Sequence, residues 1–456
     1  MTEFVKRSRI DAPAEEVFRW HARPGALERL TPPWTKLDVI ERTGGIENGA
    51  RVAFKIPVGP IHVRWVAEHC DYAEGRQFRD VQVEGPFTRW EHTHRFEPDG
   101  ASASYLEDRI VYELPLGVLG RSVGDPFVHA MLEQMFAYRH AITAQDLAVH
   151  AVYGGAPLHV AVTGATGLVG SALVPFLTTG GHRVTRLVRS NPKGDDGTVL
   201  WNPATGSIDA AALEGVDAVV HLAGESVAGA RWTDTVKARI LESRTRGTTL
   251  LAETLARLRQ PPQVLVSASA IGYYGNRGDA VLREDSAGGT GFLAAVCQEW
   301  EAATQVAEAA GIRVVHLRVG IVLSPAGGAL KAMLVPFTLG AGGRIGSGTQ
   351  YMSWIAIDDL LGAVLHALRT ETLRGPVNAV APNAVTNAEF TRVLGHVLRR
   401  PTLFPVPAVA ARLAFGEGAD EMLLASTRVE PERLQTTHYT FRHAELKAAL
   451  RHVLGR

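Results

Sequence analysis

Between residues 1 and 115, hydrophobic and polar positions alternate in short runs that are separated by turn residues. A period of two is typical of antiparallel strands, and RVAFKIPVGP and HVRWVAEHC are two of the segments that carry it. Residues 121–150 change to the period of a helix, with Phe127 and Met131 near helical spacing. The pattern therefore predicts a sheet followed by one long helix, in a first domain of residues 1–150.

From residue 158 the pattern changes to apolar runs separated by stretches of helical period. The apolar runs are HVAVTG, RVTRLVR, AVVHLAG, QVLVSAS and RVVHLRVG. Their alternation with helices predicts βαβ units and a parallel sheet that is covered on both faces. The Gly-Gly and Pro of GGAPLHV place the junction near residue 155. We expect a second domain at 158–375 and a less regular C-terminal segment at 376–456 that packs on it and ends in a helix.

Composition narrows the classes of protein that fit. Lys plus Arg equals Asp plus Glu at 47 each, so no net charge favours nucleic acid or an acidic membrane. The two cysteines, Cys70 and Cys297, form no C-x-x-C pair, which suits a reducing cytoplasm. No run reaches the roughly 18 apolar residues of a membrane helix, and MTEFVKRSRI is not followed by the apolar stretch of a signal peptide. We expect a soluble, cytoplasmic protein with no nucleic-acid partner and no membrane insertion.

The clearest motif is HVAVTGATGLVGSALVPFL at 159–177, in which an apolar strand runs into three glycines and a helix pattern follows at once. Such glycines permit a tight turn and a close backbone approach to a pyrophosphate, whose charge is met by the helix N-terminus. A tight turn without a ligand is the alternative. The motif predicts a dinucleotide site formed by Gly164, Thr166, Gly167, Leu168, Val169 and Gly170.

The second strand of this domain ends in VTRLVRS, where an NAD enzyme usually places an acidic residue on the ribose 2′-hydroxyl. Arg189 stands there instead, and an arginine suits a 2′-phosphate. We therefore expect NADP as the cofactor, with Arg189 as its clamp and Arg186 as the alternative; both could also be solvated surface residues. The small residues that end DAVVHLAGES let the backbone approach the cofactor, which adds Leu222, Ala223 and Gly224.

The spacing G-x-x-G-x-x-G resembles that of the extended short-chain dehydrogenases/reductases. ARWTDTVKARILESRTRGTTLL, SASAIGYYG, GFLAAVCQEWE, LRVGIVLSPAGGAL and GSGTQYMSWIAIDDL resemble one atypical branch, the epimerase-family proteins of the 39U class, over about 158–456. The resemblance implies an α/β Rossmann-like fold with a doubly wound parallel sheet, NADP binding and an unassigned substrate. It also adds Arg318 of HLRVG, and Arg244 at a position where the family usually has Asn, to the cofactor-side residues.

In these reductases a Ser or Thr after the fifth strand orients the substrate oxygen, a Tyr about 25 residues later is the acid, and a Lys one helical turn further lowers its pKa. Ser269 fits the first position. The expected Tyr position falls on Leu293 or Ala294, and the expected Lys position falls on Cys297 or Gln298. Both usual residues are missing, and a neutral thiol or amide cannot replace an ammonium charge. The remaining candidate catalytic residues are Ser269, Tyr274 and Cys297.

The segment GFLAAVCQEWE has its own periodicity. Leu293, Cys297 and Glu301 share one helix face because they are spaced by four residues. A packed helix face explains this spacing without any chemistry.

Residues 1–150 resemble the polyketide-cyclase/START-like (SRPBCC) superfamily through the opening strand, DAPAEEVF at 11–18 and the final helix. The resemblance implies an α+β helix-grip fold around an apolar cavity and a small, lipophilic ligand. Half of the aromatic residues, 16 of 32, lie in this part, either as a cavity lining or as core. His92 and His94 share one strand face, but no third ligand is spaced nearby, so no metal site is predicted.

Two functions fit these observations. The first is an NADP(H)-dependent oxidoreductase or epimerase acting on a hydrophobic carbonyl or sugar-like substrate. The second is a non-catalytic NADP-binding sensor or assembly factor, which explains the missing Tyr and Lys without substitutes. Some relatives carry names that imply a role in division. A homodimer is compatible with either function.

Overall fold

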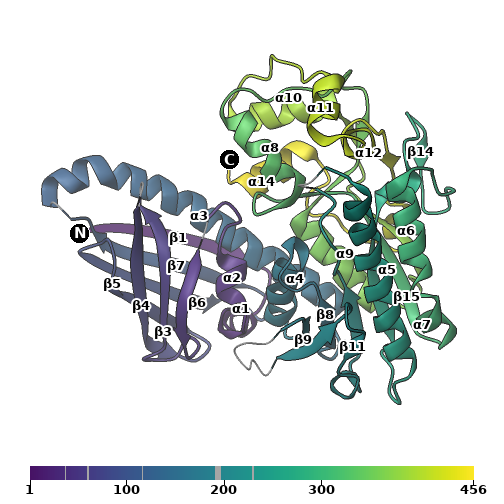
Figure 1. Ribbon diagram of the computed structural model, residues 1–456. Helices are drawn as coiled ribbons and strands as arrows, with labels where there is room; N and C mark the ends of the chain where they lie inside the picture. Colours follow the sequence, from purple (N-terminus) through teal and green to yellow (C-terminus); the bar gives the residue numbers. More distant parts are fainter. Residues whose placement is uncertain (36, 59–60, 116, 191–196, 229–230) are drawn as a thin grey trace. The chain divides into compact units, whose positions relative to one another are not determined.

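The computed structural model describes residues 1–35, 37–58, 61–115, 117–190, 197–228 and 231–456 (Figure 1). Contacts divide the chain into two units. The first comprises Met1–Gly155, Pro175–Gly181 and Gly455, and the second comprises Ala156–Val174, His182–Leu454 and Arg456. Among the helices within these ranges, none is long and apolar enough to cross a membrane.

The alternating runs of the first unit form a seven-stranded antiparallel sheet in the order β1-β7-β6-β5-β4-β3-β2. The long helix α3 packs against β1 and β7, and α1 packs against β6 and β7 (Figure 1). The sheet and the long helix confirm the helix-grip fold. The strands are β1 (Thr2–Ile10), β2 (Asp38–Thr43), β3 (Arg51–Val58), β4 (Ile61–Ala73), β5 (Gln77–Glu84), β6 (Arg89–Pro98) and β7 (Ser104–Glu113), and the helices are α1 (Ala14–Ala22), α2 (Ala26–Leu30) and α3 (Gly117–Tyr153).

Aromatic side chains make up much of the core of this unit. Buried positions alternate with less buried ones along β6 and β7, as expected for a sheet with one face covered. The rings of Phe18 and Phe96 lie 5.3 Å apart, and those of Phe4 and Phe136 lie 5.6 Å apart. These contacts favour the core-filling interpretation of the aromatic residues. The lipophilic ligand stays a prediction.

The second unit contains an eight-stranded sheet in the order β11-β10-β9-β8-β12-β13-β15-β19, in which all pairs except β10–β11 are parallel. The chain runs outward from β8 in one direction and from β12 in the other, which confirms the Rossmann-like doubly wound fold. Its strands are β8 (His159–Thr163), β9 (Arg183–Val188), β10 (Thr198–Asn202), β11 (Ser207–Ile208), β12 (Ala218–His221), β13 (Val264–Ala270), β15 (Arg313–Val319) and β19 (Gly375–Ala379).

Helices of the second unit cover this sheet through apolar contacts. Leu251 and Leu255 of α5 and Ala307 of α7 share a buried cluster with Val219 and Leu265 of the central strands. The helices that follow successive strands are α4 (Leu168–Thr179), α5 (Asp234–Ala256), α6 (Phe292–Ala302), α7 (Gln305–Ala309), α8 (Gly328–Thr338) and α9 (Ile357–Arg369), with short 3-10 turns η1 (Ala211–Leu213) and η2 (Ile271–Tyr274).

The C-terminal segment packs on the same unit through a second apolar cluster. Trp354, Phe390 and Leu450 are buried in it, and α10 packs against both α8 and α14 (Figure 1). Because β19 pairs with β15, the sheet extends past residue 375. The remaining elements are β14 (Val281–Leu282), β16 (Ile321–Leu323), β17 (Tyr351–Met352), β18 (Trp354–Ala356), β20 (Val385–Thr386), α10 (Asn387–Leu398), α11 (Ala408–Phe415), α12 (Gly418–Met422), β21 (Arg428–Val429), α13 (Glu432–Thr436) and α14 (Leu446–Leu454).

Candidate functional site

The loops after β8 and β12 meet at the carboxyl edge of the sheet, where the strand order reverses. Gly164 has φ +67°, and a Cβ atom there would lie 2.9 Å from both the Ala223 nitrogen and the Leu222 carbonyl carbon. Only glycine fits this contact. Ligands of open parallel sheets bind at such a reversal, so the structure brings Gly164, Leu222 and Ala223 together at the expected place.

The glycines that follow begin helix α4. A Cβ atom on Gly170 would lie 2.1 Å from the Gly164 carbonyl oxygen, so the first turn of the helix packs directly on the preceding loop. Gly167 and Thr166 are exposed, and Leu168 and Val169 are half-buried. A Cβ atom on Gly167 would contact only the Gly164 oxygen, at 3.3 Å. The exposed backbone ahead of α4 is thus open to an anion, and the positive end of the helix dipole favours one.

Thr163 and His221 hold the two loops in register. The Thr163 hydroxyl oxygen accepts hydrogen bonds from the Leu222 N–H at 3.1 Å and the Ala223 N–H at 3.2 Å. His221 lies within hydrogen-bond distance of Thr163 Oγ1 through Nδ1 and of Thr248 Oγ1 through Nε2. Burial lowers the pKa of His221 to about 4, so the imidazole is neutral and acts as a structural link.

Two of the expected cofactor-side arginines lie near this edge. Arg189 directly follows β9, the neighbour of β8, and its side chain is exposed. Arg244 of α5 is half-buried, and its Cζ lies 3.3 Å from the position of a Cβ atom on Gly224. Its guanidinium also lies 4.9 Å from the centre of the Trp300 ring, and burial lowers its pKa. The structure therefore places Gly224 and Arg244 in one locality.

Helix α6 presents Leu293 and Cys297 to the end of β13, where the related reductases carry their Tyr and Lys. A Cβ atom on Gly272 would lie 3.2 Å from Leu293 Cβ and 3.8 Å from Cys297 Sγ. Burial raises the pKa of the Cys297 thiol to about 11, and the carboxylate of Glu301 adds to the rise. At neutral pH this sulfur is a protonated thiol, which is neither a cation nor a nucleophilic thiolate.

A buried polar network connects this helix with the central strands. Ser269 Oγ donates to Glu301 Oε1 at 2.7 Å. Arg318 donates to both carboxylate oxygens of Glu301, at 2.8 and 2.9 Å, and to the Tyr274 hydroxyl at 3.0 Å. The Tyr274 hydroxyl in turn donates to Asn378 Oδ1 at 2.7 Å. The network fixes β13, α6, β15 and β19 against one another.

This network departs from two of the sequence-based expectations. Tyr274 is fully buried, its hydroxyl is engaged by two side chains, and burial raises its pKa, so its geometry is that of a structural residue rather than of a proton donor. Arg318 is 3% exposed and its donors go to protein groups, so in this structure its contacts are those of a packed network residue. Glu301 and Asn378 were not among the expected site residues. The four-residue spacing of Glu301 from Cys297 was the available signal, and Asn378 had none.

A pocket of about 420 Å³ lies elsewhere in the second unit. Its wall includes Gly278 and Asp279, which follow η2, and residues of the C-terminal segment. The lining combines polar side chains with a larger apolar area and consists of Gly278, Asp279, Gly346, Ser347, Thr349, Gln350, Tyr351, Ala408, Arg412, Leu424 and Ser426.

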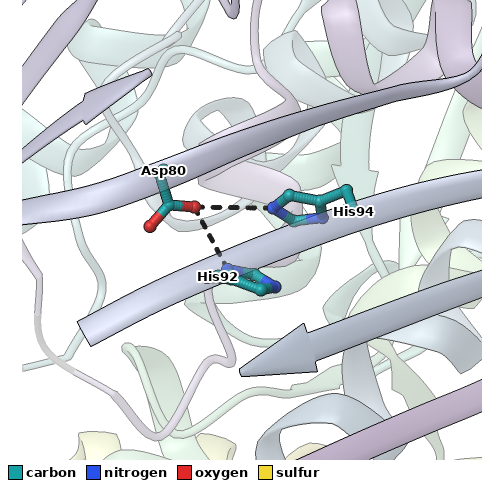
Figure 2. Close-up of side chains that lie close together, drawn as sticks. All are labelled: Asp80, His92 and His94. Carbon is teal, nitrogen blue, oxygen red and sulfur yellow. Dashed lines mark ion pairs between the residues drawn. The ribbon is translucent and has the colours of Figure 1, made fainter. Parts of the chain in front are cut away.

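The first unit corrects one further expectation. The sequence offered no third ligand near His92 and His94, but β5 pairs with β6 so that Asp80 lies directly opposite His92. Asp80 Oδ1 is 3.1 Å from His92 Nδ1 and 3.6 Å from His94 Nε2 (Figure 2). The sequence does not reveal this nearby carboxylate, because it comes from a neighbouring strand whose register the sequence does not specify.

The strand order, the glycine turn at its reversal and the following helix N-terminus define a dinucleotide-binding protein of the short-chain dehydrogenase/reductase class. The model of the NAD dependent epimerase/dehydratase family matches residues 160–379, and the model of a domain of unknown function (DUF1731) matches residues 406–453. The model described as polyketide cyclase / dehydrase and lipid transport matches residues 10–136.

Three relatives match this chain over most of their own length. Epimerase family protein Mb2239 of Mycobacterium bovis is 45% identical over 291 residues, which are 64% of this chain and 96% of the relative. The structure of human epimerase family protein SDR39U1 with NADPH has 38% identity and a TM-score of 0.61, and the match covers 65% of this chain and 99% of that one. A Corynebacterium glutamicum structure described as a nucleoside-diphosphate sugar epimerase has 36% identity and a TM-score of 0.83, and the match covers 99% of this chain and 90% of that one. The chain belongs to the epimerase family that includes SDR39U1, an NAD(P)-dependent family of the short-chain dehydrogenase/reductase class, and carries a polyketide-cyclase-like unit in front of it.

Proposed function

We propose that the second unit binds NADP(H), whose nicotinamide would exchange a hydride with the carbon of a carbonyl or sugar-like substrate while the substrate oxygen exchanges a proton with water. The observation that carries the binding step is the glycine turn at the strand reversal, where side chains on Gly164 and Gly170 would collide with backbone. A bulky anionic cofactor needs such a bare backbone surface beside a helix N-terminus. The residues present therefore fit a dinucleotide.

NADP(H) rather than NAD(H) is supported by the charge after β9. Arg189 is exposed at this strand end and provides no carboxylate for a ribose 2′-hydroxyl, whereas its guanidinium matches a phosphate. The human relative is described as a complex with NADPH. When bound, the nicotinamide would supply the hydride chemistry.

The substrate class is proposed from the hydrogen-bonding groups of the pocket. Beside a larger apolar area, the pocket of the second unit presents hydroxyl, amide and guanidinium groups, including those of Tyr351, Gln350 and Arg412, which would hydrogen-bond a hydroxyl-bearing compound. The similarity to a protein described as a nucleoside-diphosphate sugar epimerase points the same way. Ser269 does not line this pocket; in this proposal it lies at the nicotinamide end of the substrate and accepts a hydrogen bond from the substrate hydroxyl, because its own proton is donated to Glu301.

A second candidate is a protein that binds NADP(H) without turnover. The specific observation in its favour is the replacement of the usual acid and ammonium by Leu293 and the neutral thiol of Cys297, together with the burial of Tyr274. In that case the polyketide-cyclase-like unit, for which we propose a lipophilic ligand, would receive or supply a binding signal.

The binding step is tested with Arg189→Ala. We expect the variant to bind NADPH about 10 to 100 times more weakly than the wild type, because one charge-assisted contact to phosphate is lost, and to bind NADH unchanged. Arg183→Ala is the matched control, since Arg183 is exposed on the same strand β9 at its opposite end. Isothermal titration with both reduced nucleotides measures the effect. Equal weakening by the two substitutions, or no nicotinamide binding by the wild type, would refute the proposal.

Turnover is tested separately with the NADPH-loaded protein. The absorbance of the reduced nicotinamide is followed after addition of nucleotide sugars, other hydroxyl-bearing carbonyl compounds and lipophilic ketones. Oxidation that depends on one compound and slows in Ser269→Ala supports the enzyme. Binding of NADPH with no oxidation by any class would favour the second candidate.

A further inference from the structure

The first unit contains a buried cluster of ionisable side chains on the face of its sheet that α3 covers. Three adjacent strands supply it: Asp80 from β5, His92 and His94 from β6, and Asp108 from β7. The antiparallel register sets Asp80 opposite His92 and His94 opposite Asp108, so the four side chains share one face. His92, His94 and Asp108 are buried, and the Asp80 side chain is 16% exposed.

Three of these side chains direct donor atoms to one point. Asp80 Oδ1 lies 3.1 Å from His92 Nδ1 and 3.6 Å from His94 Nε2 (Figure 2), and one ligand atom of each residue lies within 4.8 Å of the others. Ligand atoms held about 2.0–2.1 Å from a tetrahedral zinc ion are separated by about 3.3 Å. The observed oxygen–nitrogen separations therefore match the edges of such a coordination shell.

Asp108 occupies the position of a group that orients metal-bound histidines. Its Oδ1 lies 2.8 Å from His92 Nε2 and 2.7 Å from His94 Nδ1, the ring nitrogens that do not face Asp80. Its Oδ2 lies 2.6 Å from His140 Nε2 of α3, which fixes the carboxylate in turn. Histidine ligands of metals usually donate their second ring N–H to a carboxylate, as the hydrogen bond between His92 and Asp108 allows, whereas His94 Nδ1 lies close to Asp108 without an aligned hydrogen bond.

The cluster is not fully satisfied by protein groups alone. Among the described residues, Nδ1 of the buried His94 has no aligned hydrogen-bond partner, although Asp108 lies close to it.

We propose that Asp80, His92 and His94 form a binding site for a divalent transition-metal ion, with Zn²⁺ the expected ion, and that Asp108 orients the two imidazoles. Two nitrogens and one carboxylate oxygen suit zinc, and three protein ligands leave a position for water or for an oxygen of a bound ligand. The first unit would thus hold a Lewis acid of its own. This inference is independent of the nucleotide proposal for the second unit.

The test uses the full-length protein after treatment with a chelator and dialysis. Zn²⁺ is titrated in competition with a chromophoric chelator, and Co²⁺ is titrated with the visible spectrum as readout. We expect one equivalent per chain and an intense tetrahedral Co²⁺ spectrum without a thiolate band. Absence of stoichiometric binding by the wild type, or a thiolate band, would overturn the proposal.

Variants then locate the ion. Asp80→Asn and His94→Gln are expected to weaken Zn²⁺ binding at least about 100-fold, whereas Asp108→Asn is expected to weaken it about 10- to 100-fold and to retain a tetrahedral Co²⁺ spectrum. His62→Asn, which removes an exposed histidine from the same unit, is the control. Circular dichroism of the metal-free proteins checks folding. Wild-type affinity in a folded Asp80→Asn variant would exclude this site.

Discussion

The three glycines of the motif that follows β8 differ in what a side chain at each would meet. A methyl group at Gly170 would lie 2.1 Å from the Gly164 oxygen, whereas one at Gly167 would approach the same atom only to 3.3 Å. We therefore expect Gly170→Ala to lower Tm by several degrees and to weaken NADPH binding about tenfold or more, and Gly167→Ala to leave Tm nearly unchanged. Thermal denaturation and titration of both variants measure this. Equal Tm values would contradict the tight contact at Gly170.

The thiol of Cys297 gives a second prediction. Burial, and then Glu301, raise its pKa from 9.0 to about 11, so the thiolate fraction at pH 8 falls by about 100-fold. In the native Cys70→Ser variant, we expect iodoacetamide to label Cys297 at least about tenfold more slowly than in denaturant at the same pH, and the native rate to rise continuously up to pH 10. Mass spectrometry follows the labelling. Rapid native labelling that is complete by pH 8 would show that Cys297 is an activated nucleophile.

Sequence reasoning identified residues whose backbone geometry is set by near neighbours. Gly164 and Gly170 are required by contacts within one turn and its partner loop, and the spacing of the motif encodes those contacts. It did not anticipate the contacts of Tyr274 and Arg318, because their partners Asn378 and Glu301 come from distant elements. Tyr274 follows β13 directly, and its local sequence would be the same whether its hydroxyl were free or hydrogen-bonded to other side chains.

The ion pair between Glu301 and Arg318 joins α6 to β15. Arg318 is buried, so removal of its carboxylate partner leaves an unpaired charge away from water. We expect Glu301→Ala to lower the free energy of unfolding by about 3 kcal/mol, measured by urea denaturation. Glu299→Ala, which changes an exposed carboxylate on the same helix, is expected to cost less than about 0.5 kcal/mol.

A double variant separates the effect of charge on stability from the effect of packing at the Glu301–Arg318 ion pair. Glu301→Leu with Arg318→Met removes both charges and keeps apolar volume, so it is expected to be more stable than Glu301→Ala. A double variant that is less stable than the single one would show that the network contributes more than charge neutralisation.

At the level of strands and helices, periodicity predicted most of the elements but not every strand pairing or its register. The five apolar runs became β8, β9, β12, β13 and β15, and the stretch at 121–150 became α3. The strand β19 was not predicted, because its five residues Gly375–Ala379 carry no alternation and gain their strand structure by pairing with β15. The register between β5 and β6 was equally hidden, and with it the position of Asp80 opposite His92.

Acid stability reflects titration over the whole molecule. In the second unit, burial lowers the pKa of His221, His366 and His443 to about 4 each. Each imidazole takes up a proton more readily in the unfolded chain, so its contribution to stability is complete above pH 6.5 and is lost as pH falls towards 4. Asp359 acts in the opposite direction, because burial raises its pKa to about 6 and favours the folded state at lower pH. Among the described residues of this unit, five histidines with a lowered pKa (His159, His221, His316, His366 and His443) stand against two carboxyls with a raised pKa (Glu284 and Asp359), which leaves a net loss of stability on acidification.

We therefore expect the Tm of the second unit to fall as the pH is lowered from 7 to 4.5. Each buried histidine costs about 1 kcal/mol by pH 5.5, so removal of one should reduce the slope measurably. Scanning calorimetry of the full chain measures the transitions at each pH. The transition of the second unit is the one whose pH dependence is weakened by His221→Asn. His396→Asn replaces an exposed histidine of the same unit and should leave the slope unchanged. If both variants keep the wild-type slope, the acid sensitivity arises from carboxylates that lose their partners on protonation, and the buried histidines are not its cause.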